Sequence, residues 1–213
     1  QRLAIILRDP VDRAYSSFYQ GKMAVNLPRT PDGFHVLATI DIAVVRSCGG
    51  LPAGDPQEDK LAVESFRQCC SKVATKFGQY QWPGCSCEFA PVATRSDHHC
   101  VLYGDKRAAQ VREGIYVHFL RLWLRYHRAR DLLILKFEDF VANMPQAGKE
   151  LTCFAQPLAA PRVCKATFKD EAVNSKAVHQ APMLVRTRQM LQDFYSPYNK
   201  DLEVLVGHRM FWS

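Results

Sequence analysis

The sequence contains no apolar run that approaches the roughly 18 residues needed to cross a bilayer. It also has no secretory signal peptide, which would combine a basic start, a short apolar stretch and a small-residue cleavage site. The chain begins with Gln1 rather than Met and enters an apolar run directly at Leu3. We therefore expect a fragment of a longer protein, and the missing targeting segment indicates nothing about that parent protein.

Two short motifs are missing as well. The sequence has no Asn-x-Ser/Thr acceptor for N-glycosylation, so glycosylation gives no clue to the compartment. It also has no Gly-x-x-x-x-Gly-Lys-Ser/Thr loop, whose backbone amides would surround the phosphates of a nucleotide. If the chain binds a nucleotide, it has to use a different element.

Positive charge is in excess, because the 28 Lys and Arg residues outnumber the 21 Asp and Glu residues. The formal net charge is therefore +7. A basic surface suits anionic partners such as a nucleotide, a sulfated glycan or a nucleic acid. The basic residues are spread along the chain, and no nucleic-acid-binding motif is present. We therefore predict no nucleic-acid partner.

Cysteine is unusually frequent for a cytosolic enzyme of 213 residues. The eight are Cys48, Cys69, Cys70, Cys85, Cys87, Cys100, Cys153 and Cys164. An even number indicates an oxidising compartment and several disulfides, whose pairing stays open; a short bridge between Cys153 and Cys164 is one possibility. Residues 78–104 read as an irregular Cys-rich loop. Zinc is the alternative there, but Cys-x-Cys and the adjacent pair His98-His99 are not the usual zinc spacings, so we predict disulfides and no metal.

The most informative stretch runs from Leu3 to Ser16. Leu3 to Leu7 is continuously apolar, as in a parallel strand that is covered on both faces. Asp9 suits the N-cap of a following helix and Pro10 its first position, with Asp12 at a capping-box-like distance. A helix that begins at the carboxyl end of a strand can bind an anion. The plainer alternative is an ordinary strand–turn–helix unit whose polar side chains are only solvated.

Residues 7–16 resemble the 3′-phosphate-binding motif, Arg-Asp/Asn-Pro-x-x-Arg-x-x-Ser, of sulfotransferases that use 3′-phosphoadenosine 5′-phosphosulfate. The resemblance implies that Arg8 and Ser16 hold the 3′-phosphate of the nucleotide. It also makes Arg13 and Lys176 candidate cofactor-binding residues, although Arg13 can equally be solvated. Lys176 falls where relatives have a basic loop over the nucleotide, and the local match there is weak.

Three further stretches resemble the same family. Gly114 to Trp123 is similar to its Gly-x-Tyr-x-x-x-Leu-x-x-Trp helix, and Leu133 to Asp139 to its strand followed by Glu-Asp, where the Glu is usually structural. Leu191 to Leu202, with Trp212 beyond, is similar to the C-terminal motif of carbohydrate sulfotransferases of the N-acetylgalactosamine 4-sulfate 6-O-sulfotransferase type. The resemblance covers residues 2–25 and 107–213, whereas residues 46–104 depart from it.

The resemblance implies an α/β fold: a P-loop-NTPase-like three-layer arrangement, with a parallel sheet flanked by helices, that lacks its N-terminal strand–loop–helix. Residues 1–213 would be the C-terminal part of one sulfotransferase domain, with an insertion at about residues 78–104. The 5′-phosphosulfate loop and the catalytic base would lie upstream of Gln1, so the chain alone would be poorly active. The implied co-substrate is 3′-phosphoadenosine 5′-phosphosulfate and the implied acceptor a sulfated or acidic glycan. The implied location is the Golgi lumen, in a type II membrane protein.

Two other functions stay open. One is a degenerate, non-enzymatic domain that binds a nucleotide or an anionic glycan. The other is a nucleotide kinase or another P-loop enzyme, which shares the sheet but not the Arg8 to Ser16 pattern.

Apolar periodicity and turn residues predict the remaining elements. We expect a second strand at 132–137. The expected helices cover residues 11–24, 34–46, 58–77, 105–128 and 140–154, the last interrupted at Pro145, and a helix pair spans 183–206.

Overall fold

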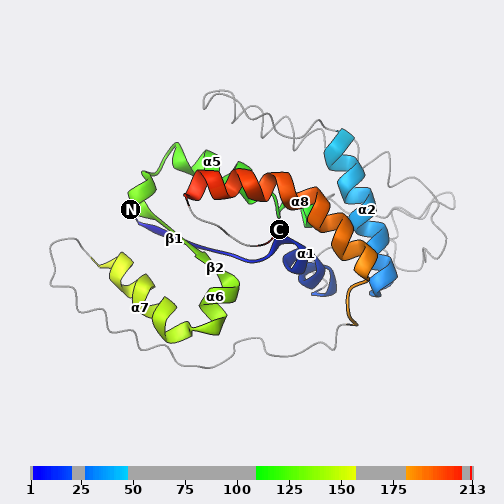
Figure 1. Ribbon diagram of the computed structural model, residues 1–213, viewed down its shortest axis with the longest axis horizontal. Coiled ribbons are helices and arrows are strands. Elements are labelled where there is room, and N and C mark those ends of the chain that lie inside the picture. The colour runs from blue at the N-terminus through cyan, green and yellow to red at the C-terminus, as the bar shows by residue number, and fades with distance from the viewer. Residues whose placement is uncertain (1, 21–26, 48–108, 157–180, 208–211, 213) are drawn as a thin grey trace, which may run out of the picture.

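The computed structural model describes residues 2–20, 27–47, 109–156, 181–207 and 212 (Figure 1). The predicted helix 58–77, the Cys-rich loop 78–104 and Lys176 lie outside these residues. The helices are α1 (Pro10–Tyr19), α2 (Pro31–Ser47), α4 (Ala109–Arg112), α5 (Tyr116–Leu124), the 3-10 turn η3 (Ala129–Asp131), α6 (Phe137–Ala142), α7 (Met144–Ala155) and α8 (Val185–Val206). The strands are β1 (Leu3–Leu7) and β2 (Leu132–Lys136). None of these helices combines the length and apolarity that crossing a bilayer demands.

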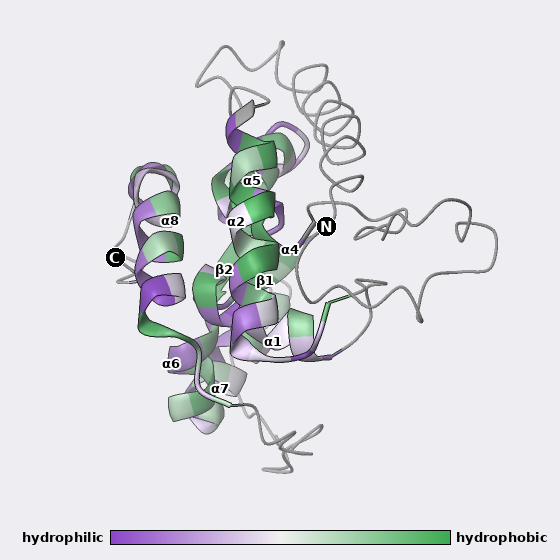
Figure 2. Ribbon diagram, turned by 90° about the vertical axis from the view of Figure 1, so that its right-hand side faces the viewer, coloured by the Kyte–Doolittle hydropathy of each residue, from purple (hydrophilic) through white to green (hydrophobic). Residues whose placement is uncertain are grey.

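The two strands pair in parallel, as predicted, with Leu3 opposite Leu132 and Leu7 opposite Lys136. Both strands therefore end at the same edge, where β1 leads through Arg8 and Asp9 into α1, and β2 leads directly into α6. Figures 1 and 2 place α1, α2, α5 and α8 on one side of the strand pair and α6 and α7 on the other. The described part of the chain is thus a mixed α/β arrangement.

The prediction that β1 is covered on both faces is wrong for the described residues. Its burial alternates along the strand: Leu7 is 7% exposed and Ile6 is 43% exposed. Ile5 and Ile134 pack against the main core, whereas Ala4 and Ile6 lie on the other face. On that other side α6 and α7 contact β2, so β1 is the less covered strand there.

The core lies between α1, α2, α4, α5 and α8 and is rich in aromatic rings. Tyr15 and Phe18 of α1 meet Phe34 of α2, with ring centroids 4.9 and 5.5 Å apart. Figure 2 shows mainly hydrophobic residues along α2 and α5 and hydrophilic residues on the outward side of α8. This core holds α1 against the end of β1, and so fixes the turn between them.

Several predicted boundaries are corrected by local contacts. The helix predicted at 34–46 begins at Pro31, because Thr30 Oγ1 accepts a hydrogen bond from the backbone N–H of Gly33 at 3.1 Å and acts as a cap. The first helix ends at Tyr19 rather than at residue 24. The strand predicted at 132–137 ends at Lys136, since Phe137 already begins α6.

The predicted helix 105–128 is broken within the described residues into α4 and α5. A Cβ atom on Gly114, between the two, would lie 2.7 Å from Tyr195 Oη and 2.9 Å from Pro10 Cβ. The break lets α8 and the start of α1 approach the backbone closely, which a continuous helix with a side chain here would not allow.

Of the two helix predictions nearest the C-terminus, one is corrected and the other is confirmed. The expected helix pair 183–206 is one helix, α8, which runs through Pro197 because Phe194, Tyr195 and Leu202 are buried on both sides of the proline. The helix predicted at 140–154 is divided at Asn143, whose Oδ1 accepts from Gln146 N at 3.2 Å, and Pro145 lies in the first turn of the new helix. The predicted interruption at Pro145 is confirmed.

Candidate anion-binding site

The turn from β1 to α1 is built around Asp9. Its Oδ1 accepts hydrogen bonds from the backbone N–H groups of Val11 at 2.7 Å and Asp12 at 3.4 Å, and Pro10 occupies the first helical position. The predicted N-cap is therefore confirmed. The pKa of the Asp9 carboxyl is raised, mainly by burial. The hydrogen bonds from the two backbone N–H groups lower this pKa, but they do not offset the burial.

Glu138 completes this turn from the end of the neighbouring strand. Its Oε1 accepts from the backbone N–H of Asp9 at 2.8 Å, and its Oε2 accepts from Trp212 Nε1 at 3.1 Å. In a capping box Asp12 would bind the N–H of Asp9, but Glu138 holds that group instead. Glu138 thus ties the ends of β1 and β2 to Trp212, in line with its predicted structural role.

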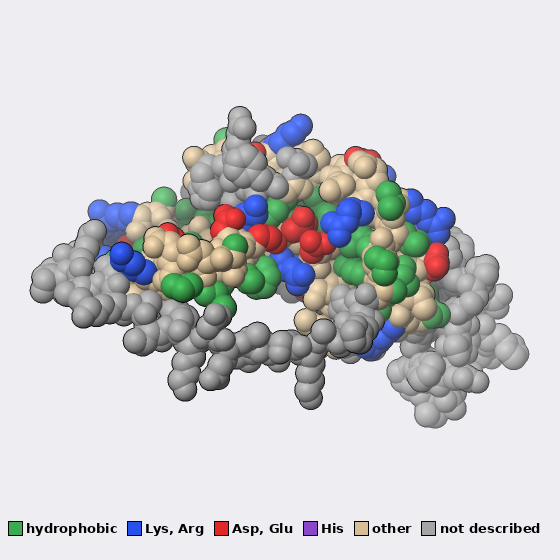
Figure 3. All heavy atoms as spheres, turned by 60° about the horizontal axis from the view of Figure 1, so that its bottom comes forward, with side chains coloured by type: hydrophobic (Ala, Val, Ile, Leu, Met, Phe, Trp, Pro, Cys, Tyr) green, Lys and Arg blue, Asp and Glu red, His purple; other side chains and the backbone are tan. Residues whose placement is uncertain are grey.

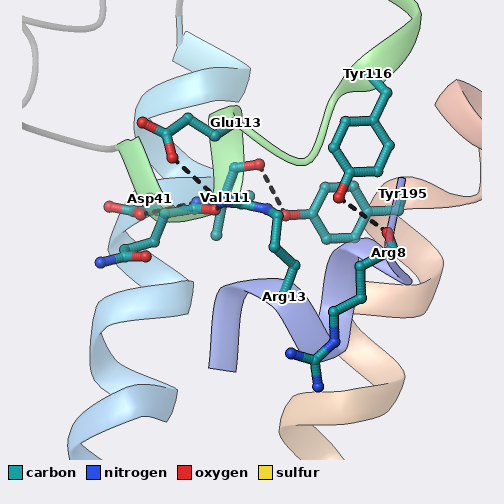
Figure 4. A network of polar contacts seen from close by, with 8 residues as sticks. Arg8, Arg13, Asp41, Val111, Glu113, Tyr116 and Tyr195 are labelled. Atoms are coloured by element: carbon teal, nitrogen blue, oxygen red, sulfur yellow. Dashed lines mark hydrogen bonds and ion pairs between the residues drawn. The ribbon is translucent and has the colours of Figure 1, made fainter. Parts of the chain in front are cut away.

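Arg8 presents its side chain at this edge. Its guanidinium carbon lies 5.3 Å from the centre of the Phe137 ring, a cation–π contact. With the described residues the guanidinium makes no hydrogen bond or ion pair, so its five N–H donors are available to a ligand. Figure 4 shows the side chain pointing away from Tyr116, Tyr195 and the Arg13–Glu113 pair.

Arg13 lies differently from Arg8. Its Nη1 binds Glu113 Oε2 at 3.1 Å, and its Nη2 donates to the backbone carbonyl of Gln110 (Figure 4). Arg13 therefore links α1 to α4 in this structure. To contact a phosphate it would have to give up one of these partners.

Ser16 lies on the outer side of α1, one turn after Asp12. Its hydroxyl accepts from Gln20 Nε2 at 3.4 Å, a long bond that leaves its own proton free to donate. Ser16 is about 9 Å along the helix axis from Pro10, at 1.5 Å per residue. A group that touches both Arg8 and Ser16 has to lie over the outer side of α1, and not at the helix end that the sequence alone suggested.

Arg188, on α8, is a cation near this site that the sequence analysis missed. It binds Asp12 at 2.7 Å and so balances the charge of the carboxylate next to Ser16. No local pattern could have identified it, since the two residues are 176 positions apart. Figure 3 shows acidic and basic side chains side by side across the middle of this face.

Two tyrosines, the half-buried Tyr116 and the fully buried Tyr195, donate hydrogen bonds to backbone carbonyls near this turn. Tyr116 donates to the backbone carbonyl of Arg8 at 2.9 Å, and Tyr195 to that of Val111 at 2.7 Å (Figure 4). Burial raises the pKa of Tyr116 to about 12 and the pKa of Tyr195 further. Both phenols stay protonated at neutral pH and act as donors. The contact of Tyr116 with Arg8 was not predicted from the sequence.

Of the predicted cofactor-binding residues, the structure describes Arg8, Arg13 and Ser16, all at or after the β1–α1 turn; Lys176 lies outside the described residues. Cys153 is disulfide-bonded, and the other seven cysteines also lie outside. Among the described residues, no three Cys, His, Asp or Glu side chains are grouped to hold a metal ion.

The chain is similar to curated proteins named carbohydrate sulfotransferase 15. The protein of Homo sapiens is 23% identical over 217 residues, and those of Rattus norvegicus and Mus musculus are each 21% identical over 215 residues. Each match covers 99% of this chain, and therefore a wider part than residues 2–25 and 107–213. The chain spans only 30–31% of the length of these relatives. No model of a protein family and no solved structure matches the chain. The predicted resemblance to carbohydrate sulfotransferases is confirmed.

Proposed function

We propose that this chain, a relative of the carbohydrate sulfotransferases, forms the part of a sulfotransferase that holds the 3′-phosphate of 3′-phosphoadenosine 5′-phosphosulfate. Arg8 and Ser16 are the proposed ligands of that phosphate. The parent protein would transfer the sulfuryl group of this nucleotide to a hydroxyl of a sulfated or acidic glycan. It would do so in the Golgi lumen, as a type II membrane protein.

The observation that carries the proposal is the state of Arg8. A guanidinium at the carboxyl end of a parallel strand pair, with no hydrogen bond or ion pair to the described residues, suits bidentate binding of a phosphate. Its backbone is held by Tyr116, and its ring contact with Phe137 limits its motion. The Ser16 hydroxyl follows on the outer side of α1 at the spacing of the sulfotransferase motif.

Three carboxylates near the turn would repel a phosphate if they were unbalanced. Asp9 and Glu138 accept backbone and indole N–H groups, and Asp12 pairs with Arg188. A phosphate over the outer side of α1 would therefore contact Arg8 and Ser16. The nearby carboxylate of Asp12 is already balanced by Arg188. A phosphate bound by Ser16 would also attract Arg188 away from Asp12, because Asp12 and Ser16 lie one turn apart on the same side of α1.

The rest of the catalytic machinery is proposed to lie in other parts of the parent protein. The loop for the 5′-phosphosulfate and the base that accepts the proton of the sugar hydroxyl would come from a strand–loop–helix that joins this sheet. The whole would then be a P-loop-like three-layer domain. In such a domain the residues of this chain bind and orient the nucleotide.

The first test is calorimetric binding of adenosine 3′,5′-bisphosphate and adenosine 5′-phosphate to the chain. We expect a preference for the bisphosphate. Arg8→Ala should remove about 1.5–3 kcal/mol of it, the value of a hydrogen bond to a charged group. Arg128→Ala, which removes another exposed cation, is the matched control and should leave the preference intact. If the parent protein, with its further segments present, showed no preference either, the proposal would be wrong.

A transfer assay on the parent protein separates the enzyme from the non-enzymatic alternative. Sulfuryl transfer to a glycan that Arg8→Ala abolishes supports the enzyme. Tight nucleotide binding without any turnover supports a domain that only binds.

A further inference from the structure

A second basic site lies at the opposite end of the two strands, where they begin. It is a pocket of about 550 Å³, within the range typical of small-ligand sites. Its walls are Arg2, Arg130, Leu133, Gln146, Lys149, Glu150, Cys153 and Phe154. The five residues of β1 lie between Arg2 and Arg8, so six steps of 3.3–3.4 Å per residue separate the two, a distance of about 20 Å. The pocket is therefore not part of the nucleotide site.

The described residues that line the pocket include three cations and one carboxylate. Arg2 uses Nη1 to donate to the carbonyls of Phe154 and Gln156, both at 2.5 Å, which leaves its Nη2 and Nε groups for a ligand. Arg130 and Lys149 are exposed and make no hydrogen bond or ion pair with the described residues. Glu150 accepts from Gln146 Nε2 at 3.0 Å. Positive charge thus predominates in this lining, and most of its N–H donors have no partner among the residues that the structure describes.

The pocket also has apolar walls. Leu133 and Phe154 contribute apolar side chains, and the Arg2 guanidinium carbon lies 5.6 Å from the centre of the Phe154 ring. A bare inorganic anion would use only the cations. A ring with an apolar face and an oxyanion substituent would use both, and a sulfated sugar has that form. Figure 3 shows Lys and Arg side chains at the end of the molecule where Figure 1 places α7 and the N-terminus.

We propose that this pocket binds a sulfated sugar residue of an anionic glycan, at a site separate from the nucleotide site. The binding of an oxyanion follows from the pocket alone, whereas the choice of a glycan rests on the proposed function. A glycan held at Arg2 is anchored about 20 Å from Arg8. A second contact of this kind raises the effective concentration of the rest of the glycan near the protein.

The test is calorimetric titration of the chain with an octasaccharide that contains N-acetylgalactosamine 4-sulfate. Its desulfated counterpart and inorganic sulfate are titrated in parallel. The pocket variant is Arg130→Glu with Lys149→Glu, two exposed positions whose replacement should leave the fold intact by circular dichroism. The matched control is Arg46→Glu with Lys200→Glu, which changes the net charge equally at exposed residues of α2 and α8 outside the pocket.

We expect the pocket variant to bind the octasaccharide at least about tenfold more weakly, as lost charge-assisted hydrogen bonds require. The control should lose less than about threefold. Equal losses in both variants would overturn the proposal, because they would show general surface attraction. Equal binding of the desulfated octasaccharide, or of inorganic sulfate, would overturn it as well.

Adenosine 3′,5′-bisphosphate separates this proposal from the proposed function. Its affinity should change by less than about threefold in the pocket variant. If the nucleotide fails to bind while the octasaccharide shows the expected loss, the proposed nucleotide site is wrong and the pocket stands. If the nucleotide binds through Arg8 while the octasaccharide shows no loss in the pocket variant, the pocket proposal is wrong and the nucleotide site stands.

Discussion

The two ends of the strand pair both present arginine, but they organise it differently. At the carboxyl ends, Asp9, Glu138 and Tyr116 bind backbone groups, so the turn that presents Arg8 is fixed by hydrogen bonds from several elements. At the amino ends, Arg130 and Lys149 extend from exposed positions around apolar walls. The first arrangement can select one phosphate geometry, and the second attracts an anion without fixing it. Stability should therefore depend strongly on the first end and little on the second.

The largest effect is expected for Glu138→Ala. The substitution leaves the N–H of Asp9 and the indole N–H of Trp212 without their acceptor, so we expect a loss of about 3 kcal/mol in the free energy of unfolding. Urea denaturation measures it. Glu138→Gln retains one carbonyl acceptor and should lose about half as much, and Asp139→Ala, at an exposed neighbour, should lose less still. Equal stability of Glu138→Ala and the unmodified chain would remove the proposed difference between the two ends.

Gly114→Ala should have the second largest effect, about 2 kcal/mol. The new Cβ would lie 2.7 Å from Tyr195 Oη and 2.9 Å from Pro10 Cβ, so either α8 or the start of α1 has to move. The free energy of unfolding, measured by urea denaturation, and the nucleotide affinity should fall together. The reason is that Pro10 directly follows Arg8 and Asp9 in the chain. Combining Gly114→Ala with Tyr195→Phe removes the closest contact, and the double variant should lose less than the sum of the two single losses. Additive losses would show that the two sites do not interact.

Asp9→Ala should cost about 1 kcal/mol at pH 7, the usual value of an N-cap, whereas Asp9→Asn keeps an acceptor and should cost less. Burial raises the pKa of Asp9 in the folded chain, so the folded state binds this proton more tightly than the unfolded state does. The stability contributed by Asp9 therefore falls as the pH rises through the interval just above its usual value of about 4. Urea denaturation between pH 4 and 7 should show the unmodified chain losing stability relative to Asp9→Asn. A difference that does not change with pH would contradict this.

The smallest effect is expected at the other end of the strands. Arg130→Ala and Lys149→Ala should each change the free energy of unfolding by less than about 0.5 kcal/mol, since both side chains are exposed and make no hydrogen bond or ion pair with the described residues. The same denaturation series measures it. A loss comparable to that of Asp9→Ala would mean that these cations support the fold and are not reserved for a ligand.

Local signals in the sequence were sufficient for the elements that carry the site. The apolar run at Leu3, the Asp9-Pro10 pair and the run at Leu132 predicted both strands and the start of α1. These signals work because the residues that determine the structure are neighbours in the chain. The start of a new helix near Pro145 was likewise predicted from residues that are neighbours in the chain.

Contacts between distant elements could not be predicted in this way. The periodic apolar residues Val111, Ile115 and Phe119 favour one long helix, and only the approach of Tyr195 and Pro10 to Gly114 explains the break. The partners of Arg13 on and just after α4, and the partner of Asp12 on α8, likewise depend on tertiary packing. The exposure of Ile6 depends on which elements cover β1, which its own sequence does not encode.

The bond between Asp9 and Glu138 also has a consequence for biosynthesis, because these residues are 129 positions apart. At typical translation rates roughly ten seconds pass between the synthesis of the two, and Trp212 follows 74 residues after Glu138. Throughout that interval the apolar run of β1 is without β2 as its partner strand. Arg8 can be positioned only after β2 has been made, so the nascent chain cannot bind a nucleotide through this turn before then.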